Sequence, residues 1–241
     1  MLHPRRVTAL ALPAGLVLAL ARCAPADASA AATPPATDAP PTAQVAATQA
    51  PATQAVATRW VVAPAGNEAR YLVREQLMGR DLPNDAVGAT PAVTGGIALD
   101  SAGAVVPAGS RFVVDVTGLK TDSDRRDNYV RRRVLETEAH PAVELRPTAL
   151  RGLPARLPAA PPAGRHTLQL VGDLTVRGVT RPTTWQVTAE YRDGRVVGTA
   201  ATAFTFDEFG ITRPRVPIVL SVADTIRLEY DFTLVPATDA P

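Results

Sequence analysis

Residues 225–234 read Thr-Ile-Arg-Leu-Glu-Tyr-Asp-Phe-Thr-Leu, and apolar and polar side chains alternate through the whole stretch. Successive side chains of a β-strand point to opposite faces, so this alternation predicts a strand with one apolar and one polar face. The apolar face carries Ile226, Leu228, Tyr230, Phe232 and Leu234. Such a strand packs one side against an apolar interior and keeps the other side in water.

Other stretches repeat this period of two. Their apolar faces are formed by Trp185, Val187, Ala189 and Tyr191, by Leu168, Leu170, Leu174 and Val176, and by Phe112, Val114 and Val116. Several strands that are apolar on one side only indicate antiparallel pairing around a shared interior, rather than a parallel sheet covered by helices.

Turn residues separate these runs. Asp193-Gly194 is a strong hairpin signal, because a type I′ turn needs a positive φ at both central positions. Arg177-Gly178 lies between the runs ending at Val176 and starting at Val179, and residues 100–103 follow another run. Consecutive hairpins predict strands in up-and-down order.

The period changes between Asp122 and Pro141, where Val130 and Val134 are one helical turn apart. Asp122 or Ser123 would cap the start of a short helix, and Pro141 would close the segment. We therefore expect an all-β fold, an antiparallel β-barrel of about eight strands with one short helix. Closure of the barrel removes the exposed edges of an open sheet.

The charge of the chain argues against polyanionic partners. Its formal net charge is +2, from 25 basic and 23 acidic residues. Without Arg5, Arg6 and Arg22 in the first 23 residues, 22 basic residues remain against 23 acidic ones. The basic residues are scattered among acids rather than gathered in a stripe, so we expect no nucleic-acid partner.

The first 23 residues are typical of an export signal. Arg5 and Arg6 precede an apolar run over residues 7–21, which is shorter than a membrane-spanning helix. Cys23, the single cysteine, lies where a bacterial lipoprotein would be lipidated, although Arg22 occupies the position of a small residue. We expect an exported protein of the periplasm or cell envelope, either anchored through lipid on Cys23 or released by cleavage after Ala28 or Ala30.

Residues 24–58 contain only Ala, Pro, Thr, Asp, Gln, Ser and Val. This composition cannot bury enough apolar surface to offset the entropy of ordering the chain, so it predicts a disordered linker. The expected organisation is a signal peptide over 1–23, the linker over 24–58, a β-barrel domain over 59–236 and a short tail over 237–241.

Three motifs in the barrel region resemble the YceI-like family of periplasmic polyisoprenoid-binding proteins. Residues 172–182 read Gly-Asp-Leu-Thr-Val-Arg-Gly-Val-Thr-Arg-Pro, which is similar to a characteristic hairpin of the family. The order Leu-Lys-Thr-Asp at 119–122, Arg-Asp at 126–127, Val-Leu at 134–135 and His-Pro at 140–141 is similar to a second family segment. Asp-Glu-Phe-Gly-Ile at 207–211 resembles a third.

This resemblance covers about residues 59–236 and implies an extended, lipocalin-like barrel whose interior holds a long isoprenoid lipid of the quinone or polyprenyl type. It implies binding, carriage or storage with no established catalysis. We also expect no cofactor. The Ser and His usual near the start of the domain are not evident in residues 61–82, and Phe204-Thr205-Phe206 replaces the arginine expected before the third motif. These departures leave the lipid head group open.

The apolar faces could form a solid core or line a tube, and periodicity alone favours a solid core. With the resemblance, we expect an open interior. Small residues that could leave space are Gly172, Ala189, Ala201 and Ala203. The expected lining residues are Phe112, Val114, Leu168, Leu170, Trp185, Val187, Tyr191, Leu228, Tyr230 and Phe232.

Two alternatives remain beside lipid binding. The first is a packed β-domain that acts as an envelope-tethered structural or interaction module. The second is a zinc hydrolase using Glu136, Glu138 and His140, although residues ending a helix before a proline need only solvent. No nucleophile elbow, phosphate-binding glycine loop or HExxH motif occurs in the sequence, so we expect neither an enzyme nor a metal site.

Overall fold

The computed structural model describes residues 55–79, 81–152 and 164–237. Contacts within the chain separate Met1–Gln49 from Ala50–Pro241, and all described residues belong to the second unit. The predicted signal peptide, Cys23, the linker up to residue 54 and most of the C-terminal tail lie outside the described residues. No helix in the described ranges is long and apolar enough to cross a membrane.

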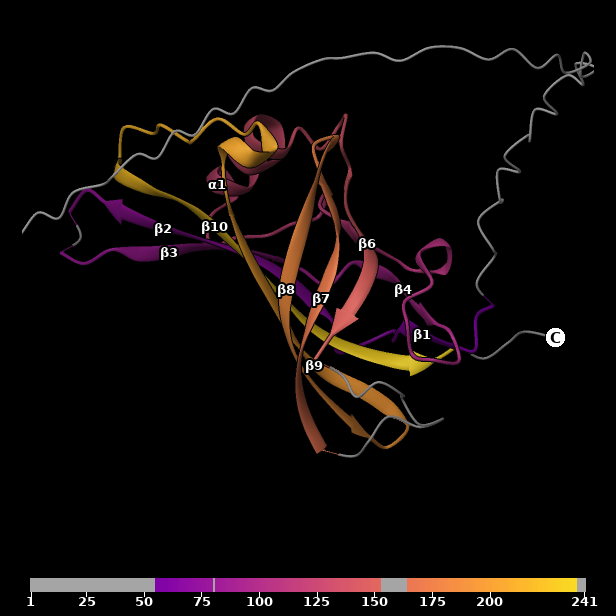
Figure 1. Cartoon of the computed structure of the whole chain (residues 1–241). Coiled ribbons are helices and arrows are strands. Elements are labelled where there is room, and N and C mark those ends of the chain that lie inside the picture. Colours follow the sequence, from indigo (N-terminus) through magenta and orange to yellow (C-terminus); the bar gives the residue numbers. More distant parts are fainter. Residues whose placement is uncertain (1–54, 80, 153–163, 238–241) are drawn as a thin grey trace, which may run out of the picture. The chain divides into compact units, whose positions relative to one another are not determined.

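Antiparallel strands make up most of the described residues (Figure 1). They are β1 (Thr58–Val62), β2 (Glu68–Leu77), β3 (Asn84–Thr90), β4 (Val93–Leu99), β5 (Arg111–Asp115), β6 (Ala142–Arg151), β7 (Gly164–Val176), β8 (Val179–Arg192), β9 (Arg195–Thr205) and β10 (Val219–Pro236). Helical segments are the 3₁₀ turns η1 (Pro107–Gly109) and η3 (Asp207–Phe209), the α-helix α1 (Asp124–Tyr129) and the π-helical segment η2 (Val130–Leu135).

Eight strands close into a ring within the described part of the chain. From β4 to β10 each strand pairs with the next one in sequence, and β1 pairs with both β4 and β10. The closing pairs include Trp60 opposite Ile97 and Val62 opposite Leu234. The prediction of an antiparallel barrel of about eight strands with one short helix is confirmed.

The β2–β3 hairpin extends this barrel beyond the ring. Strand β10 has 18 residues; its C-terminal end pairs with β1, and its earlier part, from Val219 to Asp231, pairs with β2. The hairpin therefore lengthens the barrel wall at one end.

The type I′ turn predicted at Asp193-Gly194 and the turn at Arg177-Gly178 both have a positive φ at their two central residues. Arg177 and Gly178 have φ angles of 49° and 75°, and Asp193 and Gly194 have φ angles of 51° and 73°. The first turn joins β7 to β8 and the second joins β8 to β9. These hairpins set the register that carries the apolar face from one strand to the next.

The helix lies in the connection between β5 and β6. Ser123 precedes α1 in an extended conformation, and η2 ends at Glu136, whose φ of 51° is left-handed. The buried Asp127 carboxylate accepts hydrogen bonds of 2.7 Å from both the backbone N–H and the hydroxyl of Thr121, and its other oxygen lies 3.1 Å from Lys120 Nζ. Since Lys120 also pairs with Ala89 of β3 through two backbone hydrogen bonds, α1 is fixed to the barrel wall.

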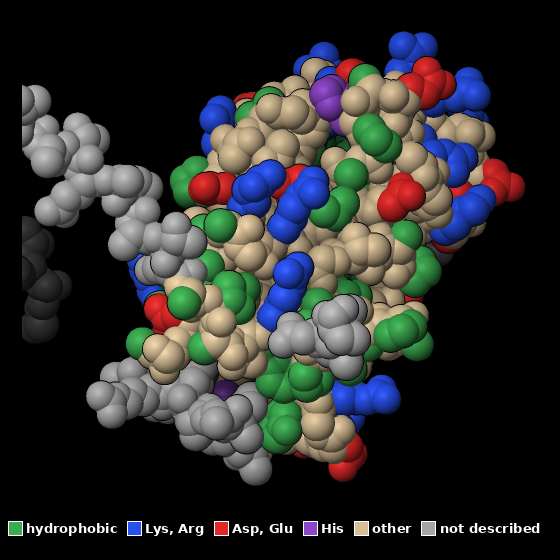
Figure 2. Space-filling model, turned by 90° about the vertical axis from the view of Figure 1, so that its right-hand side faces the viewer, with side chains coloured by type: hydrophobic (Ala, Val, Ile, Leu, Met, Phe, Trp, Pro, Cys, Tyr) green, Lys and Arg blue, Asp and Glu red, His purple; other side chains and the backbone are tan. Residues whose placement is uncertain are grey.

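The outer face of the barrel is polar. Glu144 on β6 pairs with both Arg111 and Arg146, and the Arg111 guanidinium holds the pKa of this carboxyl below its usual range. Figure 2 shows basic and acidic side chains interspersed over one side of the domain. This distribution agrees with the alternation read from the sequence.

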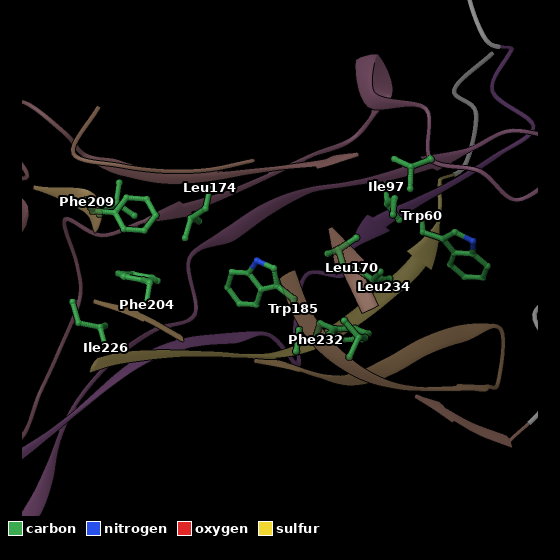
Figure 3. Packing of buried hydrophobic residues seen from close by; sticks show 14 of the residues in the cluster. Trp60, Ile97, Leu170, Leu174, Trp185, Phe204, Phe209, Ile226, Phe232 and Leu234 are labelled. Atoms are coloured by element: carbon green, nitrogen blue, oxygen red, sulfur yellow. The ribbon is translucent and has the colours of Figure 1, made fainter. Parts of the chain in front are cut away.

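The inner faces of the strands meet in the barrel interior. Phe204, Phe209, Leu174 and Ile226 gather toward one end, and Trp60 and Leu234 lie toward the other, with Trp185 between them (Figure 3). The rings of Phe204 and Phe209 are 4.4 Å apart between centroids, and Trp60 meets Tyr191 edge-on at 6.1 Å.

Candidate functional site

The interior contains a cavity of about 920 Å³. All ten strands contribute to its lining, together with α1, η2 and residues 214–218. Packed protein interiors leave few voids larger than one water, and a ligand pocket typically measures about 300–1,000 Å³. The interior is therefore a space of ligand size, rather than the solid core that periodicity alone favours.

The ten predicted lining residues all face this cavity: Phe112, Val114, Leu168, Leu170, Trp185, Val187, Tyr191, Leu228, Tyr230 and Phe232. Cross-strand pairing explains their position. Leu170 lies opposite Trp185 in the β7–β8 ladder, and directly paired residues share one face of the sheet. Their contact with a ligand remains a prediction.

The expectation that four small residues open the interior was wrong for three of them. Ala189 lines the cavity, but Ala201 and Ala203 do not, because they alternate with the inward-facing Ala200 and Phe204 on β9. Gly172 faces inward without lining the cavity. A Cβ at Gly172 would lie 2.6 Å from the carbonyl oxygen of Arg146, so this glycine lets β6 approach β7 closely.

Two tyrosines that line the cavity differ in their hydrogen bonding. The Tyr230 hydroxyl donates a hydrogen bond of 2.9 Å to Asn67 Oδ1. The Tyr71 hydroxyl is buried and has no hydrogen-bond partner among the described residues. Burial raises the pKa of Tyr71 to about 12, so the phenol stays neutral at physiological pH and keeps a proton to donate. Sequence periodicity did not identify Tyr71 as a lining residue.

One end of the cavity is basic. Arg126 on α1 lines the cavity and lies 2.8 Å from the buried carboxylate of Glu75 on β2, and it also pairs with Asp122. Further arginines line this end and are exposed: Arg125, Arg132, Arg133 and Arg215. None of these four forms an ion pair with a carboxylate in the described ranges. The sequence contains these arginines, but their spacing alone does not place them at an opening.

Glu136, Glu138 and His140 do not form a metal site in the part of the chain that the structure describes, where no cluster of His, Cys, Asp or Glu could hold a metal ion. Glu136 pairs with Arg177 at 2.6 Å, and His140 packs beside Gly178. These residues connect the end of η2 to the β7–β8 turn, so the zinc-hydrolase hypothesis receives no support.

An antiparallel barrel around an apolar cavity is the architecture of a small-ligand-binding protein. A family model described as a YceI-like domain matches residues 60–234, and the chain therefore belongs to the YceI-like family. No curated protein sequence matches the chain.

The solved structures that share this fold include the following two. The first is a polyisoprenoid binding domain from Saccharophagus degradans implicated in plant cell wall breakdown, with 10% identity and a TM-score of 0.57; the match covers 74% of this chain and 98% of that one. The second is BcnA from Burkholderia cenocepacia, with 15% identity, a TM-score of 0.50 and coverage of 71% and 96%. At these identities the likeness establishes the fold alone.

Proposed function

We propose that this protein binds, carries or stores one long isoprenoid lipid, of the quinone or polyprenyl type, in its barrel and performs no chemistry on it. The observation that carries the proposal is the apolar cavity of about 920 Å³, formed by the inner faces of all ten strands. Membership of the YceI-like family and the fold shared with a polyisoprenoid binding domain support the same ligand class.

The lining chemistry suits a hydrocarbon chain. Burial of each CH₂ group contributes about 0.8 kcal/mol, so a chain of many isoprene units is held without any specific polar contact. The charged groups of Arg126 and Glu75 form an ion pair with each other. This pairing favours a binding role over acid–base catalysis by the Glu75 carboxylate.

The alternative of a packed β-domain acting as a structural or interaction module requires a filled interior. A void of about 920 Å³ is far larger than the roughly 30 Å³ that one water occupies in the liquid. This observation favours the lipid-binding function.

The proposal includes the location of the protein in the cell. An export signal over residues 1–23 would deliver the domain to the periplasm or cell envelope, and lipid on Cys23 would tether it there through the linker. A tethered barrel would stay near the membranes that hold isoprenoid lipids.

Mass spectrometry of organic extracts tests this proposal. The protein is purified gently from a bacterial envelope fraction, with residues 1–30 in their natural processing context. We expect one quinone or polyprenyl molecule per chain and a diacylglyceryl mass on Cys23. An empty barrel that also takes up no fluorescent isoprenoid would contradict lipid binding, and an unmodified Cys23 would contradict the anchor alone.

A further inference from the structure

Exposed apolar side chains gather at one end of the barrel. Among the described residues, five large hydrophobic side chains are exposed, and four of them lie here: Met78 (62%), Leu82 (77%), Ile218 (55%) and Leu220 (62%). They come from the β2–β3 turn and the start of β10, which are joined by a 2.9 Å hydrogen bond from Met78 N to Ile218 O. Single exposed apolar residues are common on protein surfaces, but a contiguous group marks an interaction site.

This apolar group lies where the cavity reaches the surface, because residues that line the cavity here are themselves exposed, among them Asn128, Pro217 and Ile218. Ile218 lines the cavity, as do its neighbours in the β2–β10 ladder, Leu77 and Val219. The α1–η2 segment also lines the cavity, and its Arg126 pairs with Glu75 near the end of β2. Figure 1 shows the tip of the β2–β3 hairpin projecting beyond α1 at this end of the domain. We call residues 78–79, 81–82, 124–135 and 213–220 together the α1 rim.

The charge on the α1 rim is complementary to an anionic surface. Two of its carboxylates, Asp124 and Asp127, pair with Lys120, and Asp81 is the exposed carboxylate of the β2–β3 turn. Four exposed arginines on this rim form no ion pair with a described carboxylate: Arg125, Arg132, Arg133 and Arg215. Guanidinium groups bind phosphate through paired hydrogen bonds.

We propose that the α1 rim docks on the surface of a bilayer that contains anionic phospholipids. The exposed apolar side chains would enter the boundary between head groups and acyl chains, and the arginines would contact the phosphates around them. Docking in this orientation places the opening of the cavity against the hydrocarbon layer. An apolar ligand could then pass between bilayer and barrel without crossing water. This inference rests on the proposed lipid binding and adds the route by which the lipid enters and leaves the barrel.

Vesicle co-sedimentation tests the docking surface. Every protein in the test carries Cys23→Ser, so that the proposed lipid anchor cannot bind vesicles by itself. The full chain, exported by a bacterial host, is mixed with vesicles of phosphatidylcholine alone or of equal parts phosphatidylcholine and phosphatidylglycerol. R132Q/R133Q removes rim charge, and M78S/L82S/L220S removes exposed apolar groups that do not line the cavity. R192Q/R195Q is the matched control, because these arginines flank the β8–β9 turn, are exposed and form no ion pair with a described carboxylate.

We expect the unmodified protein to prefer the anionic vesicles, and more strongly at low salt. Each arginine near an anionic surface contributes about fivefold in affinity, so R132Q/R133Q should bind these vesicles roughly 25-fold more weakly. M78S/L82S/L220S should bind these vesicles about a hundredfold more weakly, because each of its three substitutions removes an apolar side chain that would leave water on docking. R192Q/R195Q should bind like the unmodified protein, and every variant should keep its thermal unfolding temperature.

Equal binding by all four proteins, or no preference of the unmodified protein for anionic vesicles, would overturn the docking surface. Lipid extraction from the same preparations separates this inference from the proposed function. Protein that carries isoprenoid lipid but does not bind vesicles would contradict docking and leave the proposed lipid binding intact. Empty protein whose vesicle binding depends on the α1 rim would contradict lipid binding and leave docking intact.

Discussion

Replacing Ala200 with phenylalanine should narrow the cavity without unfolding the barrel. Ala200 lies on β9, lines the cavity, and is paired with Val187 on one side and Tyr230 on the other, both of which also line the cavity. The new ring would project into empty space beside Tyr230, where edge-on or offset aromatic contact is favourable. We therefore expect the free energy of unfolding to change by less than about 1.5 kcal/mol.

The effect on ligand binding follows from the volume that the ring occupies. A phenyl ring displaces about six CH₂ groups of a bound chain, each worth about 0.8 kcal/mol of burial. The loss is then about 5 kcal/mol, or roughly 10³- to 10⁴-fold in Kd. This is an upper figure, because a flexible chain recovers some contact by shifting along the barrel.

Native mass spectrometry, with titration by a fluorescent isoprenoid, measures this loss. Ala201→Phe is the matched control, since Ala201 is the next residue on the same strand and lies outside the cavity lining. The control should retain its lipid. A loss smaller than tenfold for Ala200→Phe, or equal losses for both variants, would refute the assignment of the ligand to the interior.

Three further predictions concern single groups. Tyr71→Phe removes a buried hydroxyl that has no described partner and is not exposed to the cavity, so thermal stability should stay unchanged or rise and isoprenoid affinity in the same titration should stay unchanged. Burial alone raises the pKa of Asp127, but hydrogen bonds from Thr121 and the charge of Lys120 lower it overall. The stability that Asp127 provides should therefore be present above its unfolded pKa of about 3.9 and be lost as the pH falls through the folded value. Asp127→Asn should cost about 1–3 kcal/mol in urea unfolding at neutral pH and remove this acid-dependent part. Gly198→Ala should destabilise the barrel by more than about 2 kcal/mol in the same assay, because its Cβ would lie 2.1 Å from a backbone oxygen of β8; unchanged stability would show that the strands separate easily.

The barrel and its inward faces could be predicted because their signals are local. Alternation along β10 and the turns at Arg177-Gly178 and Asp193-Gly194 determine which side chains share a face. The strand pairs that close the barrel could not be predicted from such local signals. Strand β1 has only five residues, and its pairing with both β4 and β10 depends on contacts that are distant in sequence.

The volume of the interior could not be predicted from periodicity either, since the same alternation describes a filled and an open barrel. Identifying the polar groups of the cavity requires three-dimensional positions. Tyr71 belongs to the hairpin that extends the ring, and the arginines of the α1 rim reach the opening through a helical segment with a π-helical continuation. Predicting that these groups lie together requires the positions of both a helical segment and a strand, which periodicity along the sequence does not give.

Photo-crosslinking with an isoprenoid analogue that carries a diazirine along its chain tests the central claim most directly. The purified protein is loaded with the analogue, irradiated and digested, and the labelled residues are identified by mass spectrometry. We predict labels on inward-facing residues such as Leu170, Trp185 and Phe232, at a limiting stoichiometry of one per chain. Labels confined to outward-facing residues, or no saturable labelling, would contradict the assignment of this barrel as a lipid-binding container.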